Sequence, residues 1–294
     1  MEYNQGIRPV VPQAVTPMTQ PAEKTPPVSS AKLVACPVAP RQDNPPYQKG
    51  EPVALFIPCY IDQFYPEIGR ATAALLERHG VPTVYPAEQT CCGQPAFNSG
   101  YWEEAGRVIH HFCDVFAAHR WIVCPSASCT AMCRVFFGHV DPDPRIIGVG
   151  RRVFELTEFL VDILGVSDTG ATFPHKVALH IGCHGRRELG VSEAPMQLLR
   201  SVRGTTICEI PNVEECCGFG GTFSVKMPGT SLAMGRTKAE NVVKSGADVL
   251  VSPDISCLMH LGGILQRDPA TRHIRTMHIA EVLTAGVETP AAHR

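Results

Sequence analysis

The sequence predicts an α/β protein built from two tandem, pseudo-symmetric domains, and two observations carry this prediction. Short apolar segments alternate with helix-like segments, and a four-part cysteine pattern occurs twice. In each copy a Cys-Cys-Gly triplet follows a lone cysteine after 32 or 33 positions, and a last cysteine follows the pair after 37 or 40. Two independent accidents of this kind are improbable, so we infer an internal duplication. The cysteines are Cys59, Cys91, Cys92 and Cys129 in the first copy and Cys183, Cys216, Cys217 and Cys257 in the second.

The segment before the first domain has a different composition from the rest of the chain. Proline recurs throughout residues 1–50 among Gln, Thr, Ser and Ala, without a helical or strand period. Such a composition cannot bury enough apolar area to offset the cost of ordering the backbone. We therefore expect a disordered tail at 1–50, and we do not expect its Cys36 to be a ligand. The domains then span 51–166 and 172–286, with a turn-rich hinge at 167–170.

The first domain begins with a continuous apolar run at 53–57, which is typical of a strand buried on both faces of a parallel sheet. A helix is expected at 66–80, because proline stands in its first turn and glycine closes it. The other expected elements are strands at 83–85 and 121–123, a helix at 101–119 with Trp102 on its inner face, and an amphipathic helix at 154–166. This alternation implies a small parallel sheet flanked by helices, with right-handed crossovers.

The second domain repeats the plan. Strands are expected at 176–181, 205–210 and 248–251, a helix at 230–245, and a last helix and strand at 258–265 and 274–283. In both domains each cysteine group follows a strand. The loops after parallel strands collect at one edge of the sheet, so cysteines that are about 30 positions apart should meet there.

Composition and charge exclude several classes of protein. The chain has 294 residues, 44% of them hydrophobic, and a net charge of -2, whereas nucleic-acid binders usually carry a basic excess. No apolar run approaches the ~18 residues that a membrane span needs, and the N-terminus lacks the series of a signal peptide. We expect a soluble cytoplasmic protein. Thirteen cysteines, an odd number in a long chain, then favour metal binding or redox chemistry over a disulfide framework.

Four soft thiolates per domain suit an iron-sulfur cluster or a tetrahedral zinc ion. Zinc sites usually draw their ligands from C-x-x-C pairs, and neither domain has one. Adjacent cysteines at the end of a strand project in different directions, which is easier to accommodate around a larger cluster than around a single ion. We therefore favour iron-sulfur clusters, with zinc and metal-free thiol chemistry as the alternatives.

The doubled motif over residues 51–285 resembles the CCG (cysteine-rich) domain family, which includes the heterodisulfide reductase B subunit and the glycolate oxidase iron-sulfur subunit. Four segments are most similar to the lactate utilization protein A group within that family. They are Ile-Pro-Cys59-Tyr, Pro-Ser-Ala-Ser-Cys129, Glu-Cys216-Cys217-Gly-Phe-Gly-Gly and Pro-Asp-Ile-Ser-Cys257-Leu-Met-His.

This resemblance implies the iron-sulfur subunit of a multi-protein complex that oxidises L-lactate to pyruvate. The eight repeated cysteines would hold two clusters, one [4Fe-4S] per domain, through which electrons pass. The implied partners are a ferredoxin-domain iron-sulfur protein, a further subunit, and a small 2-hydroxy acid as the substrate of the complex. No residue is an evident hydride acceptor or general base, so the catalytic residues stay unassigned.

Two departures from the wider family bear on function. Heterodisulfide reductase B subunits end each motif in C-x-x-C, whereas Ser126 and Asp254 stand three positions before the last cysteines here. The absence of a fifth thiol from each motif argues against heterodisulfide cleavage, although Cys124 or Cys133 could substitute for the missing thiol. The chain also lacks a C-x-x-C-x-x-C run, so electrons must come from or go to a separate protein. A heterodisulfide-type reductase subunit and a structural zinc docking protein remain the alternative functions.

Two histidines and two further cysteines are weaker candidates. His180 and His184 flank Cys183 and could donate hydrogen bonds to cluster sulfides, although solvated loop residues are as good an interpretation. Cys113 and Cys208 fall within a predicted helix and a predicted strand, and we expect both to be core residues.

Overall fold

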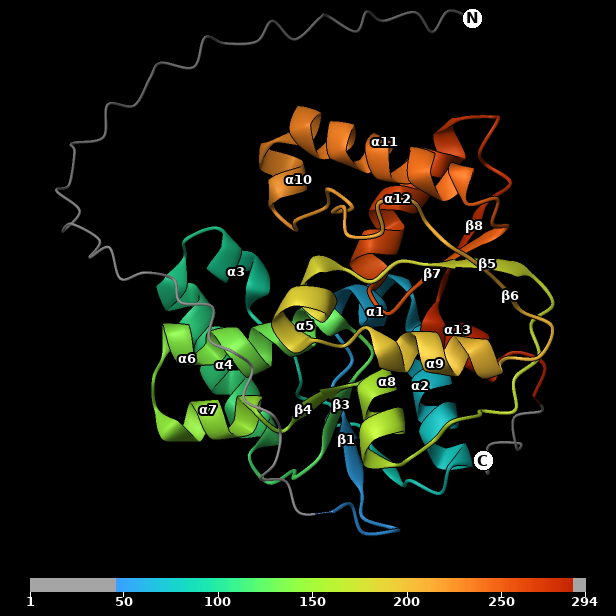
Figure 1. Cartoon of the computed structure of the whole chain (residues 1–294). Helices are drawn as coiled ribbons and strands as arrows, with labels where there is room; N and C mark the ends of the chain where they lie inside the picture. Colours follow the sequence, from blue (N-terminus) through green and yellow to red (C-terminus); the bar gives the residue numbers. More distant parts are fainter. Residues whose placement is uncertain (1–45, 288–294) are drawn as a thin grey trace, which may run out of the picture. The chain divides into compact units, whose positions relative to one another are not determined.

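The computed structural model describes residues 46–287 and contains two four-stranded sheets in which every pairing is parallel (Figure 1). The strand orders, β2-β1-β3-β4 and β6-β5-β7-β8, are the same when the second is renumbered from its first strand. The strands are β1 (Val53–Leu55), β2 (Thr83–Val84), β3 (Ile122–Cys124), β4 (Val153–Glu155), β5 (Lys176–Leu179), β6 (Thr206–Cys208), β7 (Val249–Ser252) and β8 (Arg275–His278). The prediction of two pseudo-symmetric α/β domains is confirmed.

Helices follow the strands in both domains. In the first they are α1 (Cys59–Phe64), α2 (Pro66–Arg78), α3 (Gln94–Asn98), α4 (Trp102–Phe116), α5 (Ala127–Ala131), α6 (Phe137–Val140), α7 (Pro144–Gly150) and α8 (Leu156–Glu158), with π-helical turns at Met132–Phe136 and Phe159–Ile163. In the second they are α9 (Glu193–Ser201), α10 (Phe223–Lys226), α11 (Pro228–Lys244), α12 (Ile255–Arg267) and α13 (Ile279–Thr284), with a π-helical turn at His184–Leu189. Among the described helices, none is long and apolar enough to cross a membrane.

The fourth strand of each sheet is where the sequence-based expectation was incomplete. The helix predicted at 154–166 begins as β4, which pairs with β3 through Ile122↔Val153. Similarly, the strand expected at 274–283 is divided between β8 and α13. In both places a short strand runs directly into a helix without a glycine or proline between them. A single apolar pattern therefore covers two elements.

Two aromatic side chains also differ from expectation. Trp102, predicted on the inner face of its helix, is 55% exposed, and its ring stacks on Phe97 with centroids 6.0 Å apart. Tyr47, placed in the predicted tail, packs edge-on against Trp121 at 5.9 Å, so the ordered chain begins before Val53. The rest of the tail prediction, residues 1–45 with Cys36, lies outside the described residues.

The two domains share a hydrophobic cluster. Helix α2 of the first domain packs against α13 of the second, and α9 of the second packs against α8 of the first. One cluster of buried side chains runs from Leu55 and Leu76 in the first domain to Leu179 and Val282 in the second. A separate cluster covers the other face of the first sheet, beneath α4 and α7.

Two further contacts bring the cysteine-bearing ends of the sheets together. Helix α1, after the first strand of the first domain, contacts α12, after the third strand of the second. The matching pair is the turn at His184–Leu189 and helix α5. Ala127 packs there closely enough that a Cβ on Gly185 would lie 3.1 Å from the Cβ of Ala127. This reciprocal packing places the loops after the strands of one sheet against those of the other.

Candidate metal centre

All eight repeated cysteines line one cavity of about 250 Å³ at the junction of the two domains. Cys59 begins α1, Cys91 and Cys92 follow β2, and Cys129 lies in α5, so each group sits just past a strand. Cys183, Cys216, Cys217 and Cys257 hold the matching places in the second domain. The sequence predicted one site per domain, and the structure adds that both open into the same cavity. The rings of Tyr60 and Phe219, 6.1 Å apart, contact each other across the junction in its wall.

Within each set the sulfur atoms lie close together. The Sγ atoms of Cys59 and Cys91 are 3.9 Å apart, and those of Cys217 and Cys257 are 3.2 Å apart. Two thiolates bonded to one metal atom at about 2.3 Å each lie no more than roughly 4.6 Å apart. The observed separations therefore place neighbouring sulfurs close enough to bind one metal centre.

The glycine of each Cys-Cys-Gly triplet shapes the turn that presents the paired thiols. Gly93 and Gly218 have φ values of 85° and 86°, in the left-handed region that favours glycine. In this conformation the Gly93 N–H donates a hydrogen bond to Cys91 Sγ at 3.4 Å, and the Gly218 N–H donates to Cys216 Sγ at the same distance. The triplet thus supplies two thiols and a backbone donor to one of them.

These hydrogen bonds favour the thiolate form of one cysteine in each set. The Cys59 thiol, then the Cys92 thiol and the Gly93 N–H, lower the pKa of Cys91 to about 3. In the second domain the Cys183 thiol, the Cys217 thiol and the Gly218 N–H lower the pKa of Cys216 to about 2. Metals bind the thiolate rather than the thiol, so Cys91 and Cys216 are prepared as ligands.

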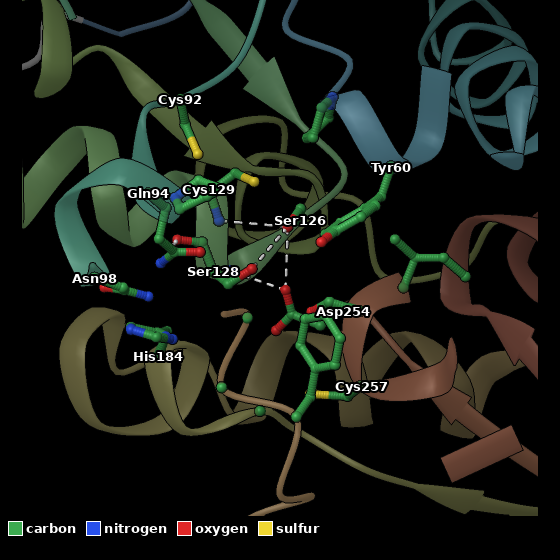
Figure 2. A pocket seen from close by; sticks show the side chains of 18 of the residues that line it. Tyr60, Cys92, Gln94, Asn98, Ser126, Ser128, Cys129, His184, Asp254 and Cys257 are labelled. Carbon is green, nitrogen blue, oxygen red and sulfur yellow. Dashed lines mark hydrogen bonds between the residues drawn. The ribbon is translucent and has the colours of Figure 1, made fainter. Parts of the chain in front are cut away.

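Ser126 and Asp254, which stand where heterodisulfide reductase B subunits carry a fifth cysteine, are hydrogen-bonded to each other. The Ser126 hydroxyl donates to Asp254 Oδ1 at 3.1 Å, and the Ser128 N–H donates to the same oxygen at 2.8 Å. Asp254 is 1% exposed and lines the cavity. In the view of Figure 2, Cys92 and Cys129 lie on one side of this group and Cys257 on the other. These two positions therefore join the domains.

The remaining described cysteines lie away from the cavity wall. Cys113, Cys124 and Cys133 are at most 1% exposed and belong to the cluster beneath α4. Burial raises the pKa of Cys124 and Cys133 well above the usual value, which keeps both thiols protonated. Cys208, on β6, packs partly buried against the shared core. Core roles for Cys113 and Cys208 are confirmed, and neither Cys124 nor Cys133 lines the cavity as a replacement thiol.

The histidines beside Cys183 have different surroundings. His184 lines the cavity, with Nδ1 3.8 Å from Cys183 Sγ. His180 is fully buried, and one of its ring nitrogens and the sulfurs of Cys217 and Cys257 all lie within 4.8 Å of one another. Burial, followed by the charge of Lys238, lowers the pKa of His180 to about 3, so its ring is neutral. Spacing alone did not associate His180 with the distant Cys217 and Cys257.

The donor set fits a metal cluster. Eight soft thiols converge on one cavity, two of them are already favoured as thiolates, and backbone N–H groups point at their sulfurs. Thiolate ligands with hydrogen-bonded sulfurs are the usual environment of iron-sulfur clusters. All twelve cysteines in the described part of the chain are free, so no disulfide competes for these sulfurs.

Comparison with known proteins agrees with this geometry. A family described as "Cysteine-rich domain" (CCG) matches residues 53–134 and 177–262, the two repeats. The chain is 47% identical to lactate utilization protein A of Exiguobacterium sp. over 243 residues, which cover 80% of this chain and 98% of that protein. It is 44% identical to lactate utilization protein A of Bacillus subtilis, over 79% and 99% of the two chains.

A solved structure shares the fold. It is a hypothetical protein from Helicobacter pylori, with a TM-score of 0.54 and 11% identity, matched over 83% of this chain. This chain spans only about half of that protein, 52% of its length, so the likeness concerns the fold alone. Together with the two family matches and the relatives that align over nearly their whole length, the paired cysteine sets show that the chain belongs to the CCG cysteine-rich domain family, in the group of lactate utilization protein A.

Proposed function

We propose that this protein is an iron-sulfur subunit of a multi-protein system that oxidises L-lactate to pyruvate. The observation that carries the proposal is the convergence of eight thiols on one cavity, in a chain whose relatives are named for lactate utilization. Oxidation of one lactate releases two electrons and two protons. A pair of thiolate-bound clusters would supply one-electron carriers for that reaction.

The residues of this chain have defined tasks under this proposal. Cys59, Cys91, Cys92 and Cys129 hold the first centre, and Cys183, Cys216, Cys217 and Cys257 hold the second, one [4Fe-4S] cluster in each. The Gly93 and Gly218 N–H groups neutralise part of the thiolate charge. The aromatic rings of Tyr60 and Phe219 keep water from one wall of the cavity.

The partners of the protein are proposed from its resemblance to the lactate utilization group, together with one motif that its sequence lacks. No C-x-x-C-x-x-C run is present, so a ferredoxin-domain iron-sulfur protein would exchange electrons with this chain, and a further subunit would complete the system. The small 2-hydroxy acid is the substrate of the complex as a whole. These partners and the cytoplasmic location remain predictions from the sequence.

A heterodisulfide-type reductase is less well supported than lactate oxidation. Such a subunit would need a fifth thiol at the positions of Ser126 and Asp254, and here those side chains hydrogen-bond to each other instead. The nearest spare thiols, Cys124 and Cys133, are packed in the core.

Single cysteine replacements test the assignment of the two centres. We expect Cys92→Ser and Cys217→Ser each to remove about half of the bound iron, because one of the two cysteine sets loses a ligand while the other is intact. Cys124→Ser is the matched control, since the second repeat carries Ser252 at that position, and it should keep its iron. Iron and sulfide are measured in anaerobically purified protein.

The pattern across the three variants decides the result. If Cys92→Ser and Cys217→Ser retain full iron, or if Cys124→Ser loses as much as they do, the ligand assignment is wrong. If the wild type contains zinc instead of iron, the electron-transfer function fails as well.

A further inference from the structure

The two repeats differ at one buried position close to the second cysteine set. The two repeats align without a gap over Val53-Ala-Leu-Phe56-Ile-Pro-Cys59 and Val177-Ala-Leu-His180-Ile-Gly-Cys183. In this alignment Phe56 is the equivalent of His180. The backbones agree as well. The Phe56 N–H donates to Val123 O at 2.9 Å, and the His180 N–H donates to Val251 O at 2.8 Å. The two side chains thus leave equivalent points of equivalent sheets.

The first repeat uses this position for packing. The ring of Phe56 lies 4.8 Å from that of Phe112 and 5.8 Å from that of Phe116, in the cluster that also contains Cys92. A phenyl ring has no lone pair, so Phe56 adds apolar contact beside the first cysteine set and no ligand.

The second repeat uses the same position differently. His180 is 1% exposed, and neither of its ring nitrogens has a hydrogen-bond partner within residues 46–287. Burying an imidazole without a partner costs stability, and such a group in a native protein calls for an explanation by function or by an unseen ion. The apolar alternative is available at this site, because the first repeat has it.

The donors around His180 supply that explanation. One of its ring nitrogens lies within 4.8 Å of Cys217 Sγ and Cys257 Sγ, and these two sulfurs are 3.2 Å apart. A neutral imidazole offers one lone pair, and imidazole and thiolate bind the same group of metals. Lys238 is also buried nearby, but its Nζ donates hydrogen bonds to Asn212 O and Val213 O, in the loop before the Cys216-Cys217 pair. It therefore does not serve as the partner of His180.

We propose that His180 is a nitrogen ligand of the metal centre held by the second cysteine set, beside Cys217 and Cys257. This inference rests on the proposed function, in which the cysteines bind iron. Its consequence is that the two centres differ chemically. Imidazole ligation changes the reduction potential of an iron-sulfur centre relative to thiolate ligation alone. The two centres should therefore have different reduction potentials.

Isotope labelling tests the nitrogen ligand directly. The full chain is purified anaerobically with natural-abundance or ¹⁵N-labelled histidine and reduced, and pulsed electron paramagnetic resonance records the nitrogen coupling to the cluster spin. We expect a strong coupling, of the size given by a directly bonded nitrogen, that changes with the label. His180→Phe, which copies the first repeat, should abolish it and shift the midpoint potential of one centre only.

His184→Gln is the matched comparison, because His184 is the other imidazole beside this cysteine set, and this variant should keep the coupling. Iron-loaded wild-type protein without a strong histidine coupling would overturn the proposal, and this result needs no variant to fold. A coupling that survives His180→Phe, or that disappears in His184→Gln, would do the same. Protein without iron would instead overturn the proposed function and this inference together.

Discussion

Asp254 is the side chain through which the two cysteine sets are joined. Its Oδ1 accepts from the Ser126 hydroxyl and the Ser128 N–H, both in the first domain, while Asp254 itself precedes α12 of the second. A buried carboxylate that accepts from two donors holds both loops in fixed positions. The spacing of the cysteine sets therefore depends on a residue that is not a predicted ligand.

Removing this carboxylate should loosen the junction. Asp254→Ala leaves the Ser128 N–H and the Ser126 hydroxyl without their buried acceptor, so we expect the free energy of unfolding to fall by about 1–3 kcal/mol. Ser126→Ala removes only one of the two bonds and should cost less. Chemical denaturation of both variants measures the difference. Equal stability of Asp254→Ala and wild type would show that the hydrogen bonds contribute nothing to the junction.

The Cys-Cys-Gly turn is the element that sets the direction of the paired thiols. Both of its glycines have a positive φ, but their surroundings differ. A Cβ on Gly218 would lie 2.5 Å from the backbone oxygen of Ser231, whereas on Gly93 the nearest atom would be 3.5 Å away. The second turn is therefore packed against α11, and the first has room.

The same replacement in the two turns separates backbone strain from packing. Gly93→Ala forces alanine into the left-handed region and should lower the free energy of unfolding by about 1–2 kcal/mol. Gly218→Ala carries the same strain and must also displace the backbone of α11, so it should cost more and reduce the iron of the second centre. Denaturation curves and iron content test this order. A larger loss for Gly93→Ala would contradict it.

The elements show how far the sequence could predict this structure. Strands β1, β3, β5 and β7 were predictable because their apolar runs end at cysteine-containing loops. Strand β4 was not, because it passes into α8 without a break, and Glu155 at its end is buried where a polar residue suggests a helix surface. The convergence of four cysteines within each domain followed from strand direction, but the single cavity that joins the two sets depends on packing between domains, which spacing does not encode.

At the scale of the whole molecule, stability should depend on pH through a buried carboxyl group. Glu155 is fully buried, and its Oε2 accepts from the Thr157 N–H at 2.8 Å, while Oε1 has no partner among the described residues. Burial raises the pKa of Glu155 from 4.5 to about 8. Between these pH values the folded protein binds a proton that the unfolded chain has lost. The contribution of the protonated Glu155 to stability is therefore full below about pH 4.5 and is lost as pH rises towards 8.

A glutamine at this position should remove that dependence. Gln is uncharged in both states, so the stability of the wild type relative to Glu155→Gln should fall as pH rises from about 5 to 8. Glu209→Gln, at an exposed position, is the control and should show no such trend relative to wild type. Unfolding free energies across this range measure the effect. A relative stability that rises with pH would mean that Glu155 is ionised in the folded protein.

The shared core and the common cavity make the two repeats one structural unit, and the content of that cavity is the central claim. The most direct test is elemental analysis of the full chain purified without oxygen. We predict a brown protein with about eight iron atoms per chain and an equal amount of inorganic sulfide, four of each per cysteine set. A colourless protein that contains zinc and no sulfide would contradict the claim.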